Sequence, residues 1–111
     1  MSVNVNAVLK DMVAAGKDSF GSNWPQIKNV AEVEFKTILL RIKEIGKAAL
    51  DPNNTITPAK AKYLIKMQVD LAAQAIVALT TMTIVAVQKA IRAVLNVVKE
   101  AVNTGLGVVL L

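Results

Sequence analysis

The stretch from Leu71 to Gln88 contains eighteen residues without a single formal charge. Its polar residues are two glutamines and three threonines, and all the others are apolar. A helix that is apolar around nearly its whole circumference has to be covered by protein or by lipid, because each Å² of apolar surface in water costs ~25 cal/mol. A chain of 111 residues has little other material to cover it. The stretch therefore predicts association between chains or contact with lipid.

The composition favours an all-α fold, organised as a single helical domain over residues 1–111. Hydrophobic residues make up 54% of the chain and charged residues 19%, which is far too apolar for a disordered chain. Good helix formers dominate, and the five glycines and three prolines are not spaced at the short intervals of a many-stranded β fold. A domain of this size buries only about 65% of its unfolded surface, so we expect an apolar one to bury more by forming oligomers.

Three helices are predicted from the spacing of the apolar residues. A short N-terminal helix covers about residues 3–18, and a second helix covers about 24–50. A third helix is predicted over 58–103: it begins after Thr57, with Pro58 as its first residue, and has no glycine or proline over 59–103. The lengths predict a long antiparallel helical hairpin with a broken first arm, in which position i lies beside a position near 108 − i.

The third helix has one competing interpretation. Thr80, Thr81 and Thr83 lower the helix propensity locally, and a break there would convert the hairpin into a four-helix bundle. Because neither glycine nor proline interrupts the stretch, the preferred prediction is one helix over 58–103, about 68 Å long at about 1.5 Å per residue.

Cysteine and histidine are both absent from the chain. It therefore has no thiol nucleophile, no thiolate metal ligand and no imidazole for acid–base catalysis or zinc binding. Asp70, at the edge of the charge-free stretch, is expected to pair with Lys66 four residues earlier rather than to act as a catalytic acid. No phosphate-binding glycine loop or nucleophile elbow is present. We expect no enzymatic activity, no metal, no cofactor and no small-molecule substrate.

The leading functional hypothesis is a non-enzymatic, self-associating helical bundle. Small and bulky apolar residues are mixed within and just beyond the charge-free stretch, which suits close packing of helices between subunits. The candidate residues of this oligomer interface are Leu71, Ala75, Ala78, Met82, Ala86, Ala90 and Ala93. The first residues lack a basic segment followed by an apolar one, so a cytoplasmic location is expected.

Two alternatives involve other partners. In the first, residues 71–88 insert into a membrane, although the arm expected beside them carries charges that are costly to place in lipid. In the second, the turn of the hairpin gathers a basic patch for weak, sequence-independent binding of nucleic acid. The residues of this basic patch are Lys43, Lys47, Lys60, Lys62 and Lys66. The net charge of +5 agrees with this use and equally with a solvated helical surface.

Overall fold

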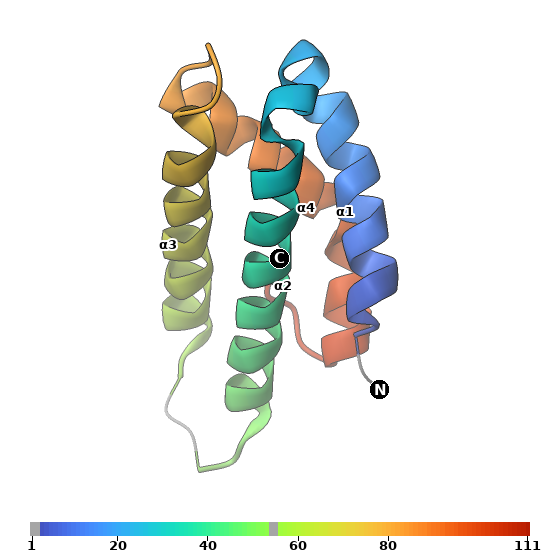
Figure 1. The fold of residues 1–111 in the computed structure, drawn as a ribbon. Coiled ribbons are helices and arrows are strands. Elements are labelled where there is room, and N and C mark those ends of the chain that lie inside the picture. The colour runs from blue at the N-terminus through green and yellow to red at the C-terminus, as the bar shows by residue number, and fades with distance from the viewer. Residues whose placement is uncertain (1–2, 54–55) are drawn as a thin grey trace.

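The computed structural model describes residues 3–53 and 56–111, and these residues are helical apart from short connections. The elements are α1 (Val5–Phe20), the 3₁₀ turn η1 (Gly21–Asn23), α2 (Trp24–Leu50), α3 (Pro58–Val77) and α4 (Ile84–Leu106). The helices run alternately up and down a molecule with principal extents of 45 × 24 × 17 Å (Figure 1). The described residues contain no strand, so the prediction of an all-α fold is confirmed for them.

Each helix packs against the one that follows it, and α4 packs against α1 to close the bundle. The inward faces of the helices share one apolar core, in which no charged or polar side chain of the described residues is buried. The largest fully buried side chains are Phe35, Met12, Ile27, Ile38, Leu39, Ile42, Ile76 and Ile91. Apolar residues spaced three or four apart on each helix therefore meet at the axis of the bundle, as amphipathic helices require.

The predicted continuous helix over 58–103 is wrong. The chain leaves helical geometry after Val77 and enters it again at Ile84, so the charge-free stretch is divided among α3, a turn and α4. The two shorter helices pack against each other and bring Ile76 and Val87, both 0% exposed, into the same core. Burial of apolar surface within one chain therefore favours the break over a straight rod.

Threonine side chains satisfy backbone groups that the break releases. The Thr80 hydroxyl donates to the Val77 carbonyl at 3.2 Å and accepts from the Met82 N–H at 3.1 Å. Thr83 caps α4, because its hydroxyl accepts from the Ala86 N–H at 3.1 Å. Hydroxyl groups that bond to the nearby backbone compete with the hydrogen bonds of the helix. This threonine cluster therefore lowers the free-energy cost of interrupting the helix, although no glycine or proline is present there.

The other helix ends agree more closely with the sequence. α2 begins and ends at the predicted residues, and Thr57 caps α3 by accepting from the Lys60 N–H at 3.1 Å. Asn4 caps α1 in the same manner through the Ala7 N–H. Asn23 occupies the cap position of α2 but its side chain makes no capping bond, because η1 carries helical backbone up to that residue. Polar caps therefore set most of these starts.

Neighbouring side chains closely approach two of the glycines that lie inside helices, Gly16 and Gly46. A Cβ atom on Gly16 would lie 2.8 Å from ring atoms of both Trp24 and Phe35. A Cβ atom on Gly46 would lie 2.9 Å from a methyl group of Leu106. At Gly16, α1 therefore packs closely against the aromatic side chains of α2. At Gly46, the last turn of α4 packs against the C-terminal part of α2. Both glycines therefore serve close packing rather than helix termination.

Candidate binding surfaces

The structure separates the candidate residues of the oligomer interface. Three are exposed on helices: Leu71, Ala75 and Ala93. Three lie in or beside the turn between α3 and α4: Ala78, Met82 and Ala86. Ala90 is only 7% exposed and belongs to the core of the chain itself, so its side chain is not available to a second copy.

The outward surface of α3 carries an apolar stripe. Its members, Tyr63, Met67 and Leu71, are 62%, 45% and 56% exposed, and their spacing of four residues places them on one face of the helix. The buried residues of α3 lie on the opposite face and are Ala61, Ile65, Val69, Ala72, Ala73 and Ile76. We call Tyr63, Met67 and Leu71 the outer stripe, which makes α3 apolar toward the core and also away from it.

Sequence reasoning missed Tyr63 and Met67 as surface residues of interest. The signal that could have identified them is a second apolar series on α3, at positions 63, 67 and 71, beside the series at 61, 65 and 69. Two such series two residues apart lie about 200° apart on a helix, so they cannot both face the same core.

The charged groups beside the outer stripe are arranged differently from the prediction. The Asp70 carboxylate accepts a hydrogen bond from the Gln88 amide at 3.2 Å, which links α3 to α4, and it does not pair with Lys66. Within residues 3–53 and 56–111, one ion pair is present, in which the Arg41 guanidinium lies 3.4 Å from the Glu44 carboxylate. Lys66 is therefore exposed without a carboxylate partner among those residues.

The five residues of the basic patch fall into two groups. Lys60, Lys62 and Lys66 are exposed on α3. Lys43 and Lys47 belong to α2, and they line a pocket at the lower end of the bundle in the orientation of Figure 1. The two groups therefore have different surroundings, and the second adjoins a cavity that a ligand could enter.

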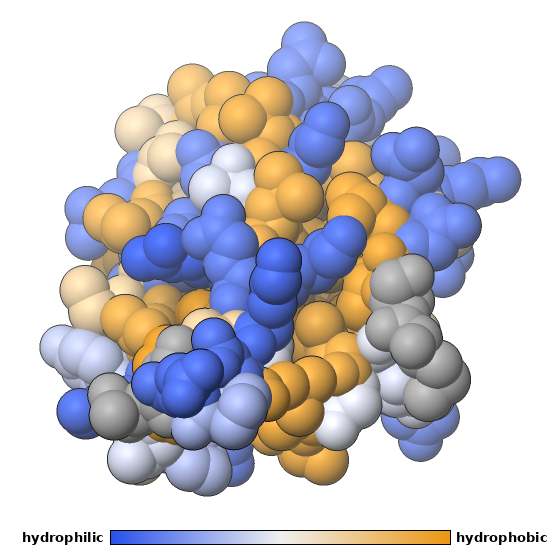
Figure 2. Space-filling model, turned by 90° about the horizontal axis from the view of Figure 1, so that it is seen from below, coloured by the Kyte–Doolittle hydropathy of each residue, from blue (hydrophilic) through white to orange (hydrophobic). Residues whose placement is uncertain are grey.

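This cavity, which we call the end pocket, has a volume of about 540 Å³. Its walls come from the segment before α1, the second half of α2 and the last turn of α4. The lining residues are Val3, Leu40, Lys43, Glu44, Lys47, Leu50, Gly105 and Leu106. Figure 2 views this end of the molecule and shows hydrophobic surface interrupted by hydrophilic side chains. The end pocket thus combines an apolar lining with lysine side chains.

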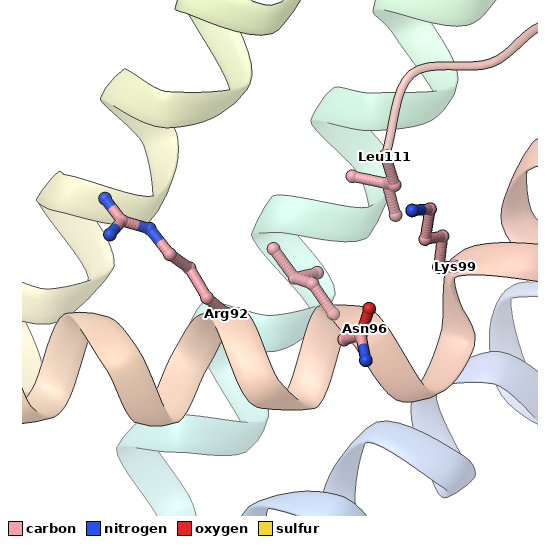
Figure 3. Close-up of a pocket in the computed structure, with 5 residues that line it drawn as sticks. Arg92, Asn96, Lys99 and Leu111 are labelled. Atoms are coloured by element: carbon pink, nitrogen blue, oxygen red, sulfur yellow. The ribbon is translucent and has the colours of Figure 1, made fainter.

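A second, smaller hollow lies along α4. Its volume is about 210 Å³, below the ~300 Å³ at which small-molecule pockets usually begin. Figure 3 shows the Lys99 side chain directed toward Leu111 and the Arg92 guanidinium directed away from it. Asn103 holds the last segment in place, since its side-chain oxygen accepts from the Leu110 and Leu111 N–H groups at 3.0 and 3.1 Å. This hollow is therefore a weaker candidate for a ligand site than a pocket of several hundred Å³.

Other kinds of site are absent from the part of the chain that the structure describes. No three acidic residues there approach closely enough to hold a metal ion. None of the helices in this part combines the length and the apolar character needed to cross a membrane. No protein-family model, no curated protein and no solved structure matches the chain. The outer stripe and the end pocket are therefore the candidate binding surfaces of the protein.

Proposed function

We propose that the protein is a non-enzymatic helical bundle that associates with a second copy of itself through the outer stripe of α3. The observation that carries the proposal is the apolar surface of Tyr63, Met67 and Leu71 on the side of α3 opposite its core face. A helix face that meets only water is normally polar. α4 has polar and charged residues along part of its exposed surface, namely Lys89, Arg92, Asn96, Lys99 and Glu100.

The charges beside the stripe favour an antiparallel arrangement of the two copies. Lys66 and Asp70 lie four residues apart, and therefore on the same side of the stripe. In an antiparallel pair of α3 helices centred near Met67, Lys66 of each copy lies close to Asp70 of the other. In a parallel pair, Lys66 and Asp70 would instead face the opposite flank of the partner's stripe, where Leu64 and Gln68 carry no charge. The antiparallel pair also has the two-fold symmetry that is commonest among homodimers.

The size of the stripe sets the expected strength of association. Stable interfaces bury about 800 Å² on each partner, and three side chains supply only part of such an area. The contact has to extend to neighbouring side chains of α3, among which Leu64 and Gln68 are half-buried and Ala75 is exposed. We therefore expect a dimer with a dissociation constant of roughly 10 µM, or about −7 kcal/mol, rather than a permanent complex.

Sedimentation equilibrium over about 1 to 200 µM tests this proposal, because that range brackets the expected dissociation constant. The average mass should rise with concentration from the 11.8 kDa of the single chain toward twice that value. Replacing Met67 and Leu71 together by glutamate should abolish the rise and leave the helical circular dichroism unchanged. The matched control is Val97→Glu, since Val97 is 63% exposed on α4 and lies outside the stripe.

A mass of one chain at every concentration would refute the proposal, and so would equal loss of association in the Val97→Glu control. A membrane or a nucleic acid as the partner would give other results with the same proteins. Flotation with anionic vesicles, or a retarded band in a low-salt gel shift, would then appear in the absence of any concentration-dependent mass.

A further inference from the structure

The end pocket has the dimensions and lining of a site for an elongated apolar molecule. Its volume of about 540 Å³ lies within the range of ~300–1,000 Å³ that small-molecule pockets occupy. Its apolar lining side chains are Val3, Leu40, Leu50 and Leu106. Leu40 and Leu50 are 42% and 55% exposed, so a ligand that covered them would remove apolar surface from water.

The wall between α2 and α4 is held by packing. Leu106 lies so close to Gly46 that a Cβ atom there would be only 2.9 Å from it, so the last turn of α4 rests directly on the α2 backbone. The helix ends immediately after Leu106, because Gly107 adopts a positive φ of 75° and its N–H bonds back to the Asn103 carbonyl at 3.0 Å. Two of the three walls of the pocket, α2 and the last turn of α4, are therefore helices packed against each other.

The charges at the pocket favour an anionic group. Lys43 and Lys47 are one helical turn apart on α2, and both line the pocket. The Glu44 carboxylate, which also lines it, is 3.4 Å from the Arg41 guanidinium, so its charge is offset. Neither lysine has a carboxylate partner within residues 3–53 and 56–111. None of the described residues that line the pocket is aromatic, so they offer a nucleobase no ring to stack on.

We propose that the end pocket binds a single-chain anionic amphiphile, with the chemistry of a fatty acid. The hydrocarbon chain lies against Leu40, Leu50 and Leu106, and the carboxylate meets the ammonium groups of Lys43 and Lys47. This pairing places the apolar and anionic parts of one molecule on the matching parts of one pocket. The ligand is a free molecule rather than a membrane surface, because a hollow of about 540 Å³ accommodates one chain.

Titration calorimetry of the full chain with sodium dodecanoate, below its micelle concentration, is the primary test. One molecule should bind per chain, and dodecanoate should bind at least tenfold more tightly than hexanoate, since each buried methylene contributes about fourfold. Dodecanol, which has the same number of carbon atoms but no charge, should bind at least fivefold more weakly than dodecanoate.

Charge reversal tests the role of the lysines. Lys43→Glu combined with Lys47→Glu should weaken the binding of dodecanoate at least tenfold. The matched control is Lys10→Glu combined with Lys17→Glu, because these lysines are exposed on α1 and do not line the pocket, and it should change the affinity less than twofold. All these proteins should keep the helical circular dichroism of the original chain.

The apolar wall is tested by a second matched pair on α2. Leu40→Asp should weaken binding at least tenfold, whereas Val33→Asp, at a residue that is 63% exposed and outside the pocket, should have little effect. Absence of binding, many molecules bound per chain, or equal effects of the two lysine pairs would overturn the proposal. Binding to anionic vesicles without binding of free dodecanoate would also overturn it, because the ligand would then be a membrane surface.

Discussion

No glycine or proline separates α3 from α4 in the sequence, yet the two helices meet their surroundings differently. Both contribute apolar residues to the same core. The outward surface of α4 carries several charged and polar residues, and its exposed large apolar residues are Ile84 and Val85 at its start and Val97 farther along the helix. The outward surface of α3 carries three large apolar residues in an unbroken row. Isolated exposed apolar residues are normal on proteins, whereas a continuous row marks a surface that a partner can cover.

The sharpest test of this comparison uses two alanines on α4. Ala90 is buried and Ala93 is exposed, although both are candidate interface residues from the sequence. Ala90→Glu should lower the free energy of unfolding by about 3 kcal/mol or more, because it places a larger, charged group in a packed core. Ala93→Glu should change it by less than about 0.5 kcal/mol.

Urea denaturation at a few micromolar protein measures both values. Equal destabilisation by the two substitutions would mean that the rotation of α4 about its axis differs from the one described.

Substitution of two threonines tests the break between α3 and α4. Thr83→Ala removes the hydroxyl that accepts from the Ala86 N–H, and should destabilise the fold by about 1 kcal/mol. Thr81 is exposed and makes no such bond among the described residues, so Thr81→Ala should cost no more than a few tenths of a kcal/mol. Thermal unfolding of the two variants side by side gives the difference, and a smaller effect at Thr83 than at Thr81 would argue against the cap.

The smallest expected change in stability comes from two glycine substitutions that distinguish a helix from a turn within the charge-free stretch. Gln74→Gly lies at an exposed position inside α3 and should cost about 0.5–1 kcal/mol, because glycine loses more backbone freedom in a helix. Thr81→Gly lies in the turn and should cost less. The two glycine variants would be equally destabilised if a continuous helix ran through both positions, and chemical denaturation would reveal this.

Local signals in the sequence were sufficient for most of the secondary structure. Apolar residues at intervals of three and four predicted α2 with its observed ends, and Thr57 with Pro58 predicted the start of α3. These signals act between residues less than one or two turns apart, through capping bonds and helix propensity. They are therefore readable without knowledge of the rest of the chain.

The sequence by itself thus determined that the chain is helical and where α2 lies. Only the tertiary structure decided that the chain turns back after Val77, that Ala90 faces the core, and that the stripe of α3 faces outward. The tertiary structure also creates the end pocket, which is lined by residues from opposite ends of the chain, Val3 and Leu106. The physical reason is that helix propensity and capping are local, whereas the burial of apolar surface depends on which distant segments come together.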